Sequence, residues 1–331
     1  MAMLNRMQEF HGLPVFDFPA SELDPQDAAE LPAPEAVAWR VGVLNPYEGD
    51  DWEVVFTRFL ATVPAAPVRA LIVGCWGDPD FGPEEAIELL VSRRDQLPAL
   101  RALFLGDLND EWVDIAQLNN EAFKTSHITQ GEVTPLLNAF TELEEFGVRG
   151  ETELSFPAVR HERLRKLVVE TAAMPVDVVR GMAASDLPAL EHLDLWLGAS
   201  AWGGNYEVAD LAPILDGARL PALKHLALRN SEFQDAICKA LATAPIVPQL
   251  EELDLSMGKL TDDGVTALLT GQSLTHLKSL DLHHNFLSTG MRNYLKELPE
   301  WHRIHINTDP EDAVLYVSRD GILHRFIEVD G

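Results

Sequence analysis

The chain has 331 residues, of which 47% are hydrophobic, so it can bury a continuous core. Its 53 acidic and 25 basic residues give a formal net charge of −28, a surface that repels nucleic acid and anionic lipid. No apolar run is long enough for a membrane span or a signal peptide, so we expect a cytoplasmic protein. For a protein in that compartment, no disulfide is expected between Cys75 and Cys238.

Residues 1–64 are predicted to form an N-terminal cap of strands plus a helix. Residues 13–18 and 37–44 have strand-like patterns, and residues 52–63 have a helical one. The stretch 20–34 between the two strands is rich in proline and acidic residues, which indicates a loop.

Residues 65–309 carry a recurring pattern: an apolar residue, two others, an apolar residue, one other, and an apolar residue. Recurrence every few tens of residues indicates a stacked array of repeats. In its clearest form the pattern begins at Leu190, Leu223, Leu250 and Leu277. Accepting other large apolar residues extends the array to about nine strands. They cover residues 68–73, 100–105, 143–148, 164–169, 190–195, 223–228, 250–255, 277–282 and 301–306.

Helix-like stretches separate these strands. The clearest starts at Thr261, an N-cap residue type followed by two acidic residues in the first helical turn. Side chains alternate along a strand, so the leucines of each repeat would face a core and the residues between them a concave surface. The predicted fold is an α/β solenoid, a curved horseshoe of parallel strands with helices outside and capping elements at both ends.

The segments 253–269 and 280–291 resemble the leucine-rich repeats of the ribonuclease-inhibitor-like type, and the whole chain resembles a group of bacterial leucine-rich-repeat proteins of uncharacterised function. The resemblance implies that Asn285 satisfies backbone groups between turns. It also implies looser turns where other residues fill that position, namely Gly198, Ser231 and Gly258.

Residues 310–331 are predicted to form a C-terminal capping hairpin. Residues 313–318 and 322–329 alternate like strands, and the Asp320–Gly321 dipeptide between them favours a tight turn. A solenoid needs a cover at each end because a bare terminal repeat exposes apolar surface and a strand edge.

The predicted function is a non-enzymatic protein-binding scaffold with no cofactor and no metal. The concave face would supply one set of binding residues: His192, Asp194, Trp196, His225, Arg229, Glu252, Asp254, Asp281, His283 and His305. Insertions after three strands, at residues 75–83, 107–132 and 197–207, would all emerge at one rim, where loops often carry binding residues. Their aromatic residues either bind a partner or pack the loops onto the body: Trp76, Phe81, Trp112, Phe123, Trp202 and Tyr206.

Several alternatives remain open at this stage. The acidic runs either attract a basic partner or keep the surface solvated. An enzyme or small-ligand protein would use Cys75 as a nucleophile, or a metal bound by Asp254, Asp281, His283 and His305. Nucleotide-binding, hydrolase and zinc motifs are absent from the sequence, which disfavours the common enzyme classes. A third interpretation is an accessory subunit of a modification or biosynthetic complex.

Overall fold

The computed structural model describes residues 6–21, 30–43, 51–77, 81–107, 128–310, 315–317, 323–325 and 327. Within these residues one twelve-stranded sheet follows the chain order from β1 to β12. Strand β1 is antiparallel to β2, and every later neighbour pairs in parallel. The strands are β1 (Glu9–Phe10), β2 (Leu13–Asp17), β3 (Ala38–Val41), β4 (Ala70–Val73), β5 (Ala102–Leu105), β6 (Glu145–Arg149), β7 (Lys166–Glu170), β8 (His192–Gly198), β9 (His225–Ser231), β10 (Glu252–Asp254), β11 (Ser279–Asp281) and β12 (His305–Asn307).

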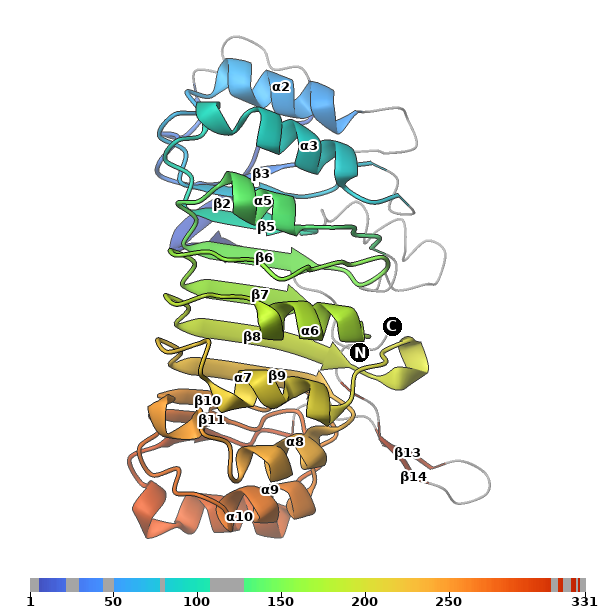
Figure 1. Ribbon diagram of the computed structural model, residues 1–331, viewed down its shortest axis with the longest axis vertical. Coiled ribbons are helices and arrows are strands. Elements are labelled where there is room, and N and C mark those ends of the chain that lie inside the picture. Colours follow the sequence, from blue (N-terminus) through green and yellow to red (C-terminus); the bar gives the residue numbers. More distant parts are fainter. Residues whose placement is uncertain are drawn as a thin grey trace.

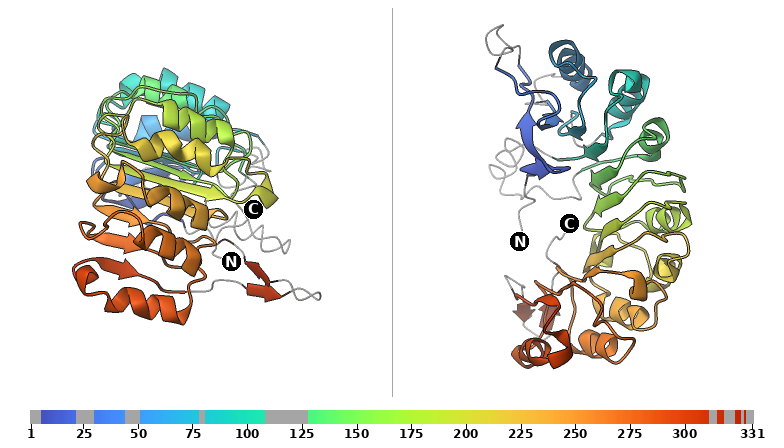
Figure 2. Two further views of the ribbon diagram at one scale, coloured as in Figure 1. Left: turned by 60° about the horizontal axis from the view of Figure 1, so that its bottom comes forward. Right: turned by 90° about the vertical axis from the view of Figure 1, so that its left-hand side faces the viewer.

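Helices lie in most of the connections between strands, on the outer side of an arc whose inner side is the sheet (Figure 1; Figure 2, right). The α-helices are α2 (Trp52–Thr62), α3 (Glu84–Ser92), α5 (Thr134–Ala139), α6 (Val176–Ala184), α7 (Ala212–Asp216), α8 (Gln234–Leu241), α9 (Asp262–Leu269) and α10 (Thr289–Glu297). Short 3₁₀ turns are η2 (Arg94–Gln96), η4 (Ser200–Trp202), η5 (Val208–Leu211), η6 (Val247–Gln249) and η7 (Pro299–Trp301). The predicted α/β leucine-rich-repeat solenoid is confirmed.

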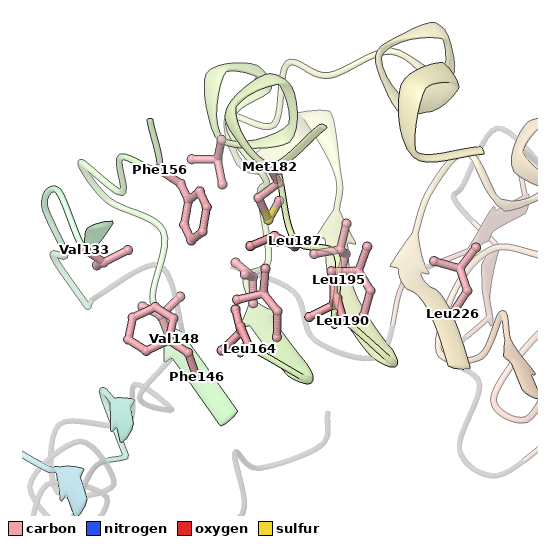
Figure 3. Close-up of a cluster of buried hydrophobic side chains, with 14 of the residues drawn as sticks. Val133, Phe146, Val148, Phe156, Leu164, Met182, Leu187, Leu190, Leu195 and Leu226 are labelled. Carbon is pink, nitrogen blue, oxygen red and sulfur yellow. The ribbon is translucent and has the colours of Figure 1, made fainter. Parts of the chain in front are cut away.

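The repeated leucines lie side by side in one interior. Leu193 pairs in register with Leu226, Leu226 with Leu253, and Leu253 with Leu280, and each is at most 2% exposed. Figure 3 shows how this interior continues from β6 to β9, with Phe146, Val148, Leu164, Leu190, Leu195 and Leu226 pointing to the same side of the sheet. The predicted start of α9 is also confirmed, because Thr261 Oγ1 accepts a hydrogen bond from the backbone of Asp263.

The predicted register of the last strand is wrong by two residues. His305 pairs with Ser279, and Ile306 takes the core position beside Leu280. The spacing of residues 301, 304 and 306 imitates the repeat pattern, but Trp301 belongs to the 3₁₀ turn η7 instead of leading into a strand. His305 therefore lies in the row of Ser279 and not in that of Asp281.

The N-terminal strands extend the same sheet beyond the first repeat. β3 pairs in parallel with both β2 and β4, so the sheet crosses the boundary expected near residue 64 without interruption. The turn between β1 and β2 brings Phe10 onto the concave face, where it packs edge-to-face on Phe104 with ring centroids 6.1 Å apart. This β1–β2 hairpin buries small residues of strands β3, β4 and β5, namely Ala38, Ala70 and Ala102. The concave surface is therefore covered at its N-terminal end.

Asn285 fulfils the role that the resemblance implies. Its Oδ1 accepts hydrogen bonds from the backbone of Gly258 (3.2 Å) and Leu260 (3.0 Å). Its Nδ2 donates to the carbonyl oxygens of Leu255 (2.9 Å) and of two residues in its own turn. One repeat that lacks such an asparagine uses another amide, because Gln234 Nε2 donates to the carbonyl of Leu228 at 2.7 Å.

The predicted C-terminal hairpin is present as β13 (Leu315–Val317) and β14 (Leu323–Arg325), an antiparallel pair forming a separate two-stranded sheet. Its Asp320–Gly321 turn lies outside the described residues. The guanidinium of Arg325 lies 5.7 Å from the ring centroid of Phe286, which joins the hairpin to the last repeats. No helix in the described part of the chain combines the length and apolar character needed to cross a bilayer.

Candidate binding site on the concave face

Side chains between the repeated leucines form rows across the inner surface of the solenoid. Neighbouring strands lie about 4.8 Å apart, so equivalent positions of successive repeats are close in space. The row that starts each strand reads, from β6 to β12, Glu145, Lys166, His192, His225, Glu252, Ser279 and His305. The predicted concave-face residues are therefore brought together on one surface, apart from the shifted position of His305.

Two histidines in this row stack face to face. The rings of His192 and His225 have centroids 3.8 Å apart and an interplanar angle of 9°. His225 Nδ1 contacts Glu252 Oε2 at 2.8 Å. Burial, together with the nearby charges of His225 and Lys166, lowers the pKa of His192 to about 3. His192 is therefore neutral at physiological pH.

Arg229 is held between two carboxylates and over an indole ring. Its Nε lies 3.2 Å from Asp194 Oδ1, and its Nη1 lies 3.2 Å from Asp254 Oδ2. Its guanidinium carbon lies 4.8 Å from the ring centroid of Trp196. Burial acts against the cation, but Asp194 and Asp254 raise the pKa of Arg229. Trp196 is only 9% exposed, so it supports this arginine and presents little surface of its own.

The proposed metal ligands do not converge. His283 Nδ1 donates to Asp281 Oδ1 at 2.7 Å, and this hydrogen bond raises the pKa of His283 against the effect of burial. Asp254 is engaged by Arg229, and His305 is exposed in another row. Among the described residues, no three His, Cys, Asp or Glu side chains are arranged to hold a metal ion.

A buried ladder of alternating charges runs along the carboxyl ends of the first strands. Arg40 contacts Asp17 (3.0 Å) and Asp107 (2.6 Å), and Arg149 contacts Asp107 (3.1 Å) and Glu170 (2.6 Å). Arg40, Asp107, Arg149 and Glu170 are all at most 8% exposed. Burial opposes the charge of Arg149, yet Glu170 and Asp107 raise its pKa. The sequence interpretation missed this ladder, although charged residues inside apolar strands were a visible signal.

A cavity of about 420 Å³ lies between the β1–β2 hairpin and strands β5 to β8. Its charged and imidazole side chains are Glu9, His11, Glu145, Lys166, Glu170, His192 and Asp194, and its apolar lining includes Phe10, Phe104 and Val168. Glu145 contacts His11 at 3.1 Å and Lys166 at 2.9 Å. Burial would raise the pKa of Glu145, but these two partners lower it overall. Gly147 leaves room for Phe104, since a Cβ there would lie 2.3 Å from that ring.

The rim aromatics divide into different roles. Phe81 is 70% exposed and Trp202 is 44% exposed, whereas Trp76 is half-buried and donates from Nε1 to the carbonyl of Phe81 at 3.0 Å. Tyr206 was expected at the rim, but it is buried in the core against Phe233, and its hydroxyl lies 2.6 Å from Ser231 Oγ. It therefore packs its insertion onto the body. Two further predicted rim residues, Trp112 and Phe123, lie outside the described residues.

Both cysteines are buried. Cys75 is 3% exposed, and its thiol lies 3.1 Å from the carbonyl oxygen of Gly77. Cys238 is fully buried, and burial raises its pKa well above the ordinary thiol value. A buried thiol is a poor nucleophile, so the expected alternative use of Cys75 gains no support from its position.

A second, larger hollow of about 1130 Å³ lies at the rim beside the amino-terminal ends of α2 and α3. In the described part of the chain, the charged residues that line it are acidic: Asp51, Glu53, Glu84, Glu85, Glu88 and Glu153. The aromatic side chains of Trp52, Trp76 and Phe81 also line it. We call this hollow the rim groove.

Comparison with known proteins supports the architecture alone. No protein-family model and no curated protein sequence matches the chain. A crystal structure of a Bacteroides fragilis protein is similar, with a TM-score of 0.75, 24% sequence identity, and coverage of 92% of this chain and 80% of that one. A leucine-rich-repeat protein of Leptospira interrogans has a TM-score of 0.34 and 19% identity, covering 76% of this chain and 56% of its own. The latter similarity is too low to support an argument.

Proposed function

We propose that this chain is a non-enzymatic, cytoplasmic scaffold that docks a basic segment of a partner protein, using the concave face from β8 to β12 and the rim groove. Its repeats are of the ribonuclease-inhibitor-like type found in bacterial leucine-rich-repeat proteins. Extended concave surfaces are what solenoids offer to partners.

The observation that carries this proposal is a preorganised acidic wall. Between β8 and β11 the concave face carries four carboxylates. Those of Glu252 and Asp281 are partly exposed, and those of Asp194 and Asp254, which are buried, flank the guanidinium of Arg229. Each carboxylate contacts a neighbouring side chain, so little rotamer entropy remains to be lost when a partner binds. An excess of fixed negative charge speeds the association of a positively charged partner.

The rim groove offers a partner both negative charge and an exposed aromatic side chain. Among the residues that the structure describes, its lining includes six acids and no base, and Phe81 is 70% exposed. Exposed aromatic side chains are frequent anchors of protein interfaces. A basic segment with an apolar residue would match both properties.

Two observations favour binding over catalysis. Cys75 is buried and held by its own loop. Of the side chains suggested as metal ligands, Asp281 pairs with His283, and Asp254 pairs with Arg229. The side chains of the acidic wall contact mainly one another and their immediate neighbours, as expected of a rigid recognition surface.

Affinity capture from the native cell, followed by mass spectrometry, tests the proposal. Wild type is expected to retain a stoichiometric protein partner whose capture weakens with salt. Glu252→Lys with Asp281→Lys should lose that partner, and Phe81→Ser should weaken its retention. Asp216→Lys is the matched control because Asp216 is exposed at the end of the outer helix α7. Equal capture by the concave-face variant and the control, or no stoichiometric partner at all, would contradict the proposal.

A further inference from the structure

From β2 to β10, ionic contacts link side chains of alternating charge along the concave face, and this series of contacts is interrupted at one place. From the N-terminal side the order is Asp17, Arg40, Asp107, Arg149 and Glu170, each in ionic contact with the next. From the other side the order is Asp254, Arg229 and Asp194. Glu170 on β7 and Asp194 on β8 are the facing ends of these two series. Among the described residues, no cation joins them by an ionic contact.

This break leaves negative charge in a poorly solvated place. Glu170 is 8% exposed and Asp194 is 9% exposed. Asp194 Oδ1 is buried and makes no hydrogen bond within the described residues, because the nearby Nε of Arg229 does not point along the required direction. A buried carboxylate oxygen without a donor is costly, which makes it a place where a ligand can gain free energy by donating.

The break opens into the cavity beneath the β1–β2 hairpin. Glu170 and Asp194 both line this cavity, and its volume of about 420 Å³ is within the range of small-molecule sites. Lys166 also lines it, but the ammonium group of this lysine is engaged by Glu145 at 2.9 Å. Among the described lining residues, the carboxylates of Glu9, Glu145, Glu170 and Asp194 therefore outnumber the one ammonium group, that of Lys166.

The remaining lining suits an apolar body. Phe10 of the β1–β2 hairpin and Phe104 of β5 pack edge-to-face on opposite sides of the cavity. Val168 lies on β7 between Lys166 and Glu170, and Gly147 on β6 contributes no side chain. The backbone N–H of Met7 donates to the carboxylate of Asp107 at 3.3 Å, so the segment that leads into β1 is attached to the ladder of buried charges. The cavity thus combines an aromatic end with an anionic end.

We propose that this cavity binds a small organic cation, with its ammonium group between Glu170 and Asp194 and its apolar body against Phe10, Phe104 and Val168. The bound ammonium completes the alternation of charge and supplies the donor that Asp194 Oδ1 lacks. This site shares Asp194 with the acidic wall that docks a protein partner, but the rest of its lining lies beneath the β1–β2 hairpin.

Isothermal titration calorimetry of the full-length protein at pH 8 tests the site with three amines: 2-phenylethylamine, n-butylamine and agmatine. At least one should bind with a Kd below roughly 1 mM. For 2-phenylethylamine, the neutral isostere 2-phenylethanol should bind at least tenfold more weakly, because a charge-assisted hydrogen bond contributes more than a neutral one.

Variants then locate the cation. Asp194→Asn should weaken amine binding at least tenfold, whereas Asp216→Asn, the same change on the outer surface, should leave it unchanged. Circular dichroism and urea unfolding confirm that both variants are folded. The proposal is overturned if none of the three amines binds, if 2-phenylethanol binds as well as 2-phenylethylamine, or if Asp194→Asn keeps the wild-type affinity. Because no partner protein is used, such a failure leaves the proposed docking function standing.

Discussion

Replacing Asp194 by asparagine should stabilise the fold, although it removes one half of an ion pair. Burial raises the pKa of Asp194 to about 6, and the carboxylates of Asp254 and Glu170 add to the effect of burial, while Arg229 opposes it. The charged form is therefore penalised in the folded protein. Asparagine has nearly the same shape and resembles the protonated acid, so it avoids this penalty.

The expected gain in the free energy of unfolding follows from the pKa shift of Asp194. Raising the pKa from 3.8 to about 6 corresponds to about 3 kcal/mol of destabilisation when the group is fully ionised. Arg229 keeps a partner in the variant, because its Nη1 lies 3.2 Å from Asp254 and its guanidinium lies over Trp196. The variant should therefore avoid the strong loss that follows when a buried charge is left alone.

The pH dependence has a definite sign. For an acid whose folded pKa lies above its unfolded value, the penalty is complete above the folded pKa and disappears as the pH falls below the unfolded one. The variant should be more stable than wild type by up to about 3 kcal/mol at pH 8. At pH 4 this advantage should shrink to roughly 0.5 kcal/mol. Burial lowers the pKa of His192 and acts in the opposite direction, but equally in both proteins, so it cancels in the difference.

Urea unfolding of wild type and Asp194→Asn at pH 8 and pH 4 measures this difference from the two midpoints. Asp216→Asn should show no change at either pH. A variant that is less stable than wild type at pH 8 would refute the reasoning, because the pair with Arg229 would then outweigh the cost of burying the carboxylate.

Three further outcomes follow from the packing. Asn285→Ala should cost about 3 kcal/mol in urea unfolding, since it leaves several buried backbone groups of adjacent turns without partners. Gly198→Ala should lower Tm strongly, because Gly198 has a positive φ and an added Cβ would lie 1.9 Å from the carbonyl oxygen of Ala172. Gly203→Ala should lower Tm much less, because Gly203 also has a positive φ but an added Cβ there would face open space. Cys75 and Cys238 should not react with a thiol reagent in the native state but should react after unfolding. Rapid labelling of the native protein would contradict the buried positions of these two thiols.

The core of the solenoid could be predicted from the sequence because its signal is local. The period of two along a strand sends Leu193 and Leu195 to the same side, and the same spacing in the next repeat places Leu226 and Leu228 beside them. The helix start at Thr261 and the contacts of Asn285 are equally local, since each depends on one residue type at one position of the repeat. These predictions needed no knowledge of long-range contacts.

Other features depend on partners that are distant along the chain. Arg40 and Asp107 are 67 residues apart, so nothing in the local pattern shows that they meet. The β1–β2 hairpin covers the first repeats because Phe10 packs on Phe104, which lies four strands further along the sheet. Tyr206 is likewise an aromatic residue in an insertion, which is why the sequence predicts it at the rim. Its buried position results from packing against Phe233.

The central claim is that the inner surface of the solenoid recognises a protein partner. Photocrosslinking in the native cell tests it most directly, with p-benzoylphenylalanine placed at Ser279 on the concave strand β11 or at Asp216 on the outer helix α7. We expect a discrete protein adduct from position 279 and none from position 216. Adducts of equal yield from both positions, or an adduct from position 216 alone, would contradict the account.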